Sequence, residues 1–215
     1  EASSTGTSAY VTKHRVYSTA GSLLRYSALN DATEWVDDDP AASMAGFINV
    51  SQESEGSQRL LVAASYNGST AIFARENIVV YSLSTNPEEN AILNTLENTG
   101  TFAPHSVVPF GNTDVFYLHD TGVRSIRSRD GTNAAYVSDV GSAIDPFIQD
   151  IIAEVGESAA ARAEAIIDPR DGRYLLGIGN YILALSYFPE VKITAWSYLD
   201  QGYSIDNLVR SGRDM

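Results

Sequence analysis

Apolar and polar residues alternate along most of this chain in short runs, each about as long as a β-strand. The runs are rich in valine, isoleucine, tyrosine and phenylalanine, and turn-forming residues separate them; examples are residues 78–83, 114–118, 174–178 and 181–185. β-Branched and aromatic side chains favour strands because they cover the pleated surface of a sheet. The pattern therefore predicts an almost all-β chain.

Four pairs of runs repeat one plan, in which two strands fold back about a tight turn. The turns are centred on Gly21-Ser22, Glu76-Asn77, Thr121-Gly122 and Gly179-Asn180. They recur at intervals of about 45 to 60 residues, and about 45 residues make one four-stranded blade of a β-propeller. The sequence thus favours a β-propeller of four-stranded antiparallel blades, in partial form because about three and a half blades do not close a ring. A β-sandwich also spaces its hairpins regularly and is the alternative.

The repeat also predicts which positions are buried. The runs ahead of three hairpins, residues 60–64, 105–108 and 163–167, are expected to be the innermost strands of their blades. Apolar positions within the hairpins are expected to lie buried between blades: Phe73, Val80, Phe116, Ile126, Leu176 and Leu183.

One short helix is inserted among the strands, near residues 145–155. Asp145 and Pro146 precede a series of apolar residues at helical spacing, and Gly156 follows it. The pattern predicts a helix from Asp145 to Glu154 with Asp145 as its capping residue. Residues 88–96 fit a further turn of helix and a long loop equally well.

Length and composition limit the class of protein. A chain of 215 residues can bury one core, so a single propeller-type domain over 1–215 is expected. The sequence begins with Glu1 and ends within a polar segment, as a fragment of a longer protein would. It contains no apolar run long enough for a membrane anchor, and with no cysteine it offers no disulfide or zinc–thiolate site.

The charge balance argues against a protein that grips nucleic acid. The formal net charge is −13, from 27 acidic and 14 basic residues, and Lys13 and Lys192 are the only lysines. Binding to a phosphate backbone requires clustered lysine and arginine, which this sequence lacks. We therefore expect no DNA binding by the isolated protein.

Motifs that carry catalysis are missing from the sequence. It has no nucleophile elbow, zinc-protease motif, phosphate-binding loop or EF-hand loop, and its three histidines lie far apart in different runs. We predict a protein that is not an enzyme, with no catalytic, cofactor-binding or metal-binding residues. One compact acidic run, Asp37, Asp38 and Asp39, could collect a hard cation, but a solvated loop is the preferred interpretation. These three aspartates are candidate residues for a loop tip or for the wall of the central channel of a propeller, that is, candidate channel-facing or loop-tip residues.

The stretch from Gly111 to Ile126, GNTDVFYLHDTGVRSI, resembles the tail hub and nozzle proteins of short-tailed phages (tail tubular protein B-like, packaged-DNA stabilisation protein-like). The similarity continues through residues 139–145, 168–174, 181–189 and 195–197, and upstream through residues 15–27 with Glu34-Trp35. Each motif alone is common in propellers. Their order, with the helix at the same place, is more specific.

The resemblance implies a structural virion protein, made in the host cytoplasm and built into the phage tail. It implies a homo-oligomeric ring, a hexamer in this family, that contacts the portal adaptor and distal tail proteins. The ring would form part of the channel through which DNA is ejected, without sequence-specific binding. Acidic residues that face such a channel would repel the phosphate backbone. No catalytic residues are implied, because the family's role is structural.

The competing hypothesis is a propeller that binds or cleaves glycans, in a phage tail or on a bacterial surface. Trp35, Trp196 and Tyr203 could stack on sugar rings if they are exposed. As core residues they would need no ligand.

Overall fold

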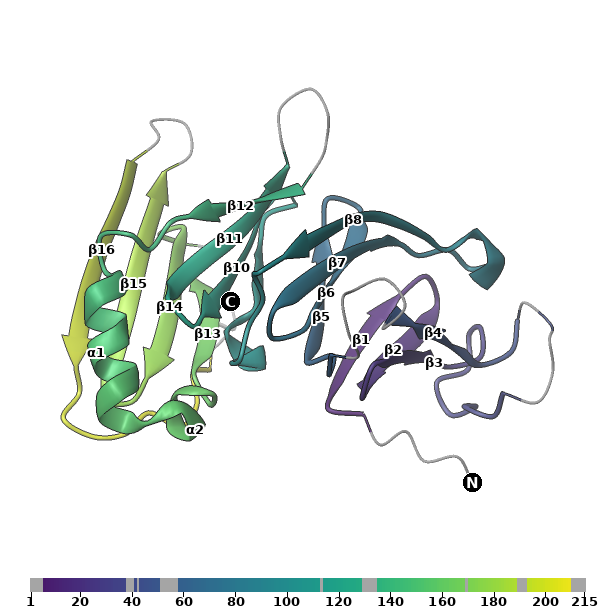
Figure 1. The fold of residues 1–215 in the computed structure, drawn as a ribbon, viewed down its shortest axis with the longest axis horizontal. Coiled ribbons are helices and arrows are strands. Elements are labelled where there is room, and N and C mark those ends of the chain that lie inside the picture. Colours follow the sequence, from purple (N-terminus) through teal and green to yellow (C-terminus); the bar gives the residue numbers. More distant parts are fainter. Residues whose placement is uncertain are drawn as a thin grey trace, which may run out of the picture. The chain divides into compact units, whose positions relative to one another are not determined.

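The structure is a computed structural model, and it describes residues 6–37, 41, 43–50, 58–112, 114–128, 135–168, 170–188 and 193–209. Within these residues the strands form four antiparallel sheets of four, and each sheet takes four strands that follow one another along the chain (Figure 1). The predicted all-β class is confirmed.

The strands occupy the following residues. The first sheet contains β1 (Ser8–Thr12), β2 (Arg15–Ala20), β3 (Leu23–Tyr26) and β4 (Gly46–Asn49). The second contains β5 (Val62–Tyr66), β6 (Ser69–Phe73), β7 (Asn77–Ser82) and β8 (Ala91–Glu97). The third contains β9 (Val108–Phe110), β10 (Asp114–His119), β11 (Gly122–Ser128) and β12 (Ala135–Asp139). The fourth contains β13 (Glu164–Asp168), β14 (Arg173–Ile178), β15 (Tyr181–Phe188) and β16 (Ile193–Asp200).

All four predicted hairpins are confirmed as the strand pairs β2–β3, β6–β7, β10–β11 and β14–β15. Three of their turns place a glycine at positive φ: Gly21 at 61°, Gly122 at 141° and Gly179 at 57°. In these three hairpins, the place where the strands fold back follows from the turn chemistry that the sequence displays.

The chain divides into two compact units. Unit 1 comprises residues 1–101 and 128–136, and unit 2 comprises residues 102–127 and 137–215. Unit 1 thus holds the sheets β1–β4 and β5–β8. Unit 2 holds the helices and the sheet β13–β16, together with most of the sheet β9–β12.

The two sheets of unit 1 share one apolar core. Tyr17, Leu24 and Tyr26 of the first sheet cluster there with Ile72, Val79 and Tyr81 of the second. Fully burying a side chain of this size contributes about 1.5–3 kcal/mol relative to leaving it exposed. This core fixes the faces of β3 and β7 against each other.

The core of unit 2 joins the helix α1 (Asp145–Val155) to both of its sheets. Ile148 and Ile151 of α1 are buried among residues of β10 and β14. The rings of Phe116 and Tyr174 lie 5.3 Å apart, and the Tyr174 hydroxyl donates a 3.0 Å hydrogen bond to the Ser106 carbonyl. The short helix α2 (Glu157–Ala160) follows α1 directly.

A segment after β16 returns across the fourth sheet. The Ile205 amide donates to the Gly179 carbonyl at 2.8 Å, and the Leu208 amide donates to the Glu164 carboxylate at 2.9 Å. A Cβ on Gly177 would meet the side chains of Ile205 and Leu208 at 3.2 Å, so glycine lets this segment lie close to β14.

Strands β6, β7 and β10 are buried at consecutive positions rather than at every second one. Because successive side chains in a strand point to opposite faces, both faces of these strands are covered. The predicted burial is confirmed at every position named for it: Phe73, Val80, Phe116, Ile126, Leu176 and Leu183.

The predicted helix is confirmed and is one residue longer than expected, ending before Gly156, whose φ is 82°. The predicted cap is wrong. Ile144 occupies the capping position, and the Asp145 carboxylate instead lies 2.9 Å from the guanidinium of Arg124. An ion pair with β11 has therefore replaced the expected bond to the helix backbone.

Two further expectations need correction. Residues 88–96 are neither helix nor loop, since a 3₁₀ turn at Pro87–Glu89 leads into β8. Residues 105–108 are not one strand, because a 3₁₀ turn at Pro104–Ser106 comes first and β9 begins at Val108. The other two predicted innermost strands correspond to β5 and β13.

Candidate functional site

Of the three candidate aspartates, only Asp37 lies within the described residues. It is exposed in the connection between β3 and β4, while Asp38 and Asp39 lie outside the described residues. The negative charge of its carboxylate contributes to raising the pKa of the Tyr26 hydroxyl. Asp37 therefore belongs to the surroundings of Tyr26.

The histidines are held in separate parts of the structure. His14 lies in the β1–β2 turn, His105 in a 3₁₀ turn, and His119 at the end of β10, where its Nδ1 is 2.9 Å from the Thr121 hydroxyl. In the described part of the chain, no three histidine or carboxylate side chains are grouped as a metal ion would require.

Arg15 is the most unusual buried residue of unit 1, with 2% of its surface exposed. Its Nη1 donates to the carbonyls of Ser27 at 2.6 Å and Met44 at 2.8 Å, and its Nη2 donates to the Thr85 carbonyl at 3.3 Å. Its guanidinium carbon lies 5.0 Å from the centre of the Tyr26 ring, a cation–π distance. Hydrogen bonds from this one side chain thus connect β2 to three segments: the one after β3, the one before β4 and the one after β7.

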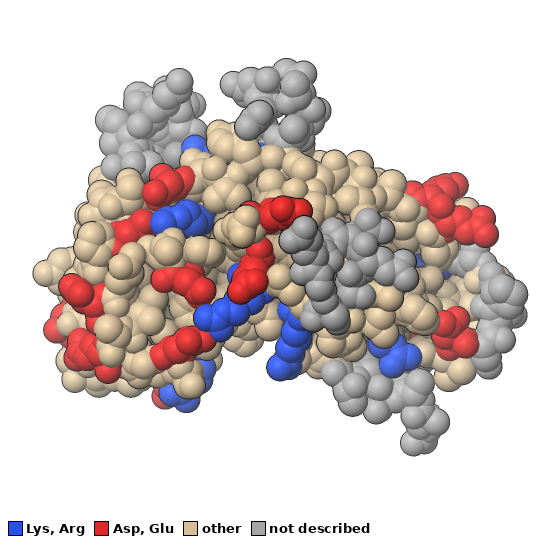
Figure 2. Space-filling view, viewed as in Figure 1, with Lys and Arg blue, Asp and Glu red and all other residues tan. Residues whose placement is uncertain are grey.

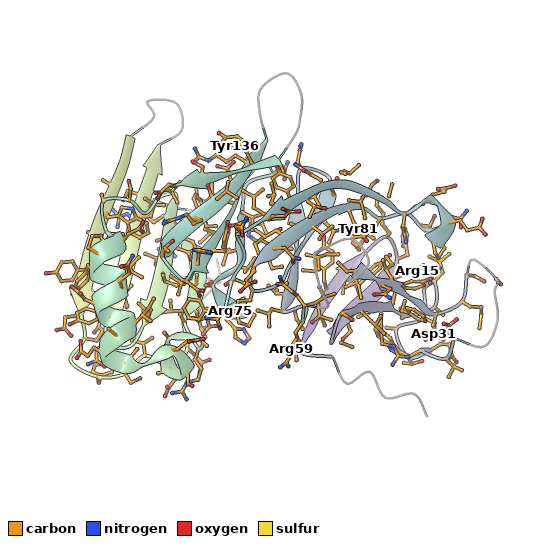
Figure 3. All side chains as sticks on the ribbon, viewed as in Figure 1. Arg15, Asp31, Arg59, Arg75, Tyr81 and Tyr136 are labelled. Carbon is orange, nitrogen blue, oxygen red and sulfur yellow. The ribbon has the colours of Figure 1, made fainter. Side chains whose placement is uncertain are left out.

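Next to this arginine, unit 1 has an open pocket of about 410 Å³ between its two sheets. Its lining includes Tyr26, Phe47, Asn49, Tyr81, Pro87 and Asn90. Figure 3 labels Arg15 of β2 and Tyr81 of β7, which belong to the two sheets of unit 1. Aromatic rings beside amide groups suit a neutral ligand with both apolar and hydroxyl surfaces.

A glycine shapes one wall of this pocket. Gly46 of β4 lies opposite Tyr26 of β3 in the ladder, and a Cβ there would be 2.5 Å from the Tyr26 hydroxyl. The ring of Tyr26 therefore lies across β4 because position 46 has no side chain. Phe47, the next residue, is 51% exposed and forms the rim.

Two tyrosines of unit 1 are shifted toward the neutral form. Burial raises the pKa of Tyr17 to about 12, against a smaller lowering by Arg15. Burial also raises the pKa of Tyr26, with Arg15 lowering it and Asp37 raising it. Both side chains therefore keep their protons in the folded protein at a pH where the unfolded chain releases them.

These shifts predict loss of stability at high pH. The stabilisation is complete below the unfolded pKa of about 10 and is lost as pH rises from about 10 to 12. Tyr17→Phe should flatten this decline in unit 1. The measurement is urea unfolding between pH 8 and pH 12, followed by ¹⁹F NMR of 5-fluorotryptophan at Trp35. Tyr203→Phe, at an exposed position of unit 2, is the control, and an unchanged slope in Tyr17→Phe would contradict the prediction.

The aromatic residues proposed for sugar stacking have different surroundings. Trp196 packs against the core of unit 2, and its Nε1 donates to the Val140 carbonyl at 2.9 Å. Trp35 is half-buried and donates to the Ala32 carbonyl at 2.8 Å, whereas Tyr203 is exposed. The sequence did not predict that Tyr26, Phe47 and Tyr81 line a pocket.

The burial of Arg15 was also not predicted from the sequence. The signal was present, because Arg15 shares its face of β2 with Tyr17 and Thr19, which are both buried. An arginine in phase with buried residues indicates an inward-facing cation.

By its fold the chain belongs to the all-β class, with antiparallel four-stranded sheets in chain order. The solved structures that resemble it include the major allergen Mala s 1 of Malassezia sympodialis (10% identity, TM-score 0.48) and Sqt1 of Saccharomyces cerevisiae (8% identity, TM-score 0.45). The similarity covers 92% and 91% of this chain, but only 64% and 62% of theirs. No family model matches the sequence, and no curated protein matches it. In the described residues, no helix is long and apolar enough to cross a membrane.

Proposed function

We propose that the chain is a structural, non-enzymatic part of a phage tail, a subunit of the hub or nozzle ring, and that its four sheets are blades of a β-propeller. The observation that best supports the propeller is the repeated four-stranded meander, combined with strands buried on both faces. The tail role is proposed from the sequence resemblance. In a two-sheet sandwich, each sheet turns one face to solvent. Blades inside a propeller have neighbours on both sides.

The first and fourth sheets support a propeller that continues. Val11 of β1 and Phe47 of β4 are 71% and 51% exposed, and Leu199 of β16 is 58% exposed. Ile48, next to Phe47, packs against the core of unit 1, and the alternation of a strand turns Phe47 to the opposite face. Leu199 is turned away from the core of unit 2 in the same way, because it lies an odd number of positions from Trp196, which packs against that core. Further blades, from the rest of a longer chain or from another copy, would cover these apolar side chains.

In this proposal the protein acts passively on DNA. The ring of identical subunits connects the portal adaptor to the distal tail proteins, and genome DNA passes through it. Figure 2 shows acidic residues scattered over the visible face, with basic residues interspersed among them. At physiological salt, repulsion of phosphates extends about 8 Å, so only acidic residues that line the channel closely would keep DNA from adhering.

Cryo-electron microscopy of the virus particle tests the structural role. We expect four-stranded blades in a ring around the tail channel, and mass spectrometry should detect the chain in purified particles. Particles that lack the protein would contradict the proposal. In a band-shift assay at about 0.15 M salt, the isolated protein should not retard duplex DNA. Tight, salt-sensitive retardation would contradict the passive channel.

The pocket of unit 1 favours one second candidate, a glycan-binding propeller. Phe47 at the rim and the amides of Asn49 and Asn90 offer stacking and hydrogen bonds to a sugar. A glycan array distinguishes the two functions. Binding that is lost in Phe47→Ala but kept in Val11→Ala would favour glycan recognition, and no binding would favour the structural role alone.

A further inference from the structure

Three aromatic rings gather on unit 2 where α1 lies along β15 and β16 (Figure 1). The Phe147 ring of α1 lies 5.2 Å from that of Tyr181 and 4.8 Å from that of Tyr198, measured between ring centres. Tyr181 and Tyr198 are 6.3 Å apart. Phe147 and Tyr181 pack against the core of unit 2, whereas Tyr198 is 62% exposed, so the outer side of the cluster presents aromatic surface to solvent.

Negative charge surrounds these rings. Asp200 lies opposite Tyr181 in the β15–β16 ladder, which places both side chains on the same face as Tyr198. Glu154 is in the last turn of α1, where the helix has no basic residue to offset its negative end. Partial burial, Asp200 and Glu154 each raise the pKa of Tyr181.

These two carboxylates lack the arginine partner that four others in unit 2 have. Arginines pair with Asp139, Asp145, Asp114 and Asp171 elsewhere in the unit. Within the described residues, neither Glu154 nor Asp200 forms an ion pair. An exposed group of ring faces next to unmatched carboxylates is complementary to a cation.

The strand beside the rings also has a free edge. In the order β13-β14-β15-β16, β16 is the outermost strand, and its described pairing is with β15 alone. An edge strand presents unpaired amide and carbonyl groups to an incoming extended chain. The position therefore favours a protein segment over a free small cation.

We propose that the edge of β16 binds an extended, arginine-containing segment of a partner protein, with the arginine placed over Tyr198 and Phe147 and facing Asp200 and Glu154. Arginine suits this position better than lysine because its planar, weakly hydrated guanidinium stacks on rings while it pairs with carboxylates. The proposal concerns the interaction surface alone and does not depend on a role in a phage tail.

The test uses a five-residue peptide with arginine at its centre and valine and threonine on either side. Its matched control carries citrulline, which has the same shape without the charge. We expect the arginine peptide to shift the NMR resonances of Tyr198, Tyr181 and Phe147, with a dissociation constant on the order of a millimolar. The citrulline peptide should bind about fivefold more weakly.

Three variants locate the binding site. Tyr198→Ser and Asp200→Asn should each weaken binding by about two- to fivefold. Asparagine keeps an oxygen for the hydrogen bond that the Gly202 amide donates to Asp200, so the turn after β16 is retained. Leu199→Ser, at a similarly exposed position on the opposite face of β16, should leave binding unchanged. Equal binding of the two peptides, or shifts away from β16, would overturn the proposal.

Discussion

Replacing Arg15 by methionine should lower the free energy of unfolding of unit 1 by about 3–5 kcal/mol. Methionine fills much of the same space but donates no hydrogen bond. The carbonyls of Ser27, Met44 and Thr85 would each lose a charged donor in a buried place. Tyr26 would lose the cation beside its ring. The large effect is expected because several segments meet at this one side chain.

The measurement is urea unfolding followed at each tryptophan separately. The chain has two tryptophans, Trp35 in unit 1 and Trp196 in unit 2. ¹⁹F NMR of 5-fluorotryptophan resolves them without further mutation. Arg25→Met is the matched control, because Arg25 is partly exposed on the neighbouring strand β3, and it should change stability by less than about 0.5 kcal/mol. Equal effects of the two substitutions would show that Arg15 is not a central support.

Gly141→Ala should destabilise unit 2 by about 3 kcal/mol. A Cβ at this position would lie 2.6 Å from the Asp145 carboxylate and 2.7 Å from the Val123 carbonyl. The backbone cannot easily move away, since the Gly141 carbonyl accepts hydrogen bonds from the amides of Ile144 and Asp145 at the start of α1. The added methyl group would push β11 away from the helix and disturb the pair between Asp145 and Arg124.

Trp196 reports directly on this substitution, because its indole donates to the carbonyl of the preceding residue, Val140. The control is Gly111→Ala, also in unit 2, where a Cβ would meet nothing within 4 Å and φ is 63°. It should cost about 1 kcal/mol, from backbone conformation alone. A smaller loss in Gly141→Ala than in Gly111→Ala would disprove the packing argument.

The hairpins and α1 were predictable because local rules determine them. A glycine or asparagine in the turn fixes where two strands fold back, and alternation then fixes which side chains are buried. Residues 145–155 had helical spacing between a proline and a glycine. In both cases, sequence neighbours supply most of the information.

Strand β8 was not predictable because its pairing with β7 is irregular. Val80 pairs with Asn94 and Tyr81 pairs with Ile92, so Leu93 is an extra residue in the ladder. A bulge of this kind interrupts the period of two. The apolar residues Ile92, Leu93 and Leu96 consequently have helical spacing in a strand, and only the partner strand reveals the difference.

The two candidate binding surfaces were unpredictable for a related reason. Tyr26 and Tyr81 are 55 positions apart, and Phe147 and Tyr198 are 51 apart, by subtraction of their residue numbers. Each pair meets only through tertiary packing. Their sequence neighbourhoods resemble those of any other aromatic residue in a strand or helix.

The chain-order arrangement of the sheets has a consequence for biosynthesis. Each sheet is built from adjacent hairpins, so its contacts have low contact order and it can form soon after leaving the ribosome. The Arg15 cluster is an exception, since Thr85 follows it by 70 positions. A nascent chain that has emerged only as far as residue 60 has its whole first sheet but no acceptor from Thr85. Until synthesis passes that residue, the apolar face of the first sheet is uncovered, and this interval is when the growing chain is most open to chaperones or to aggregation.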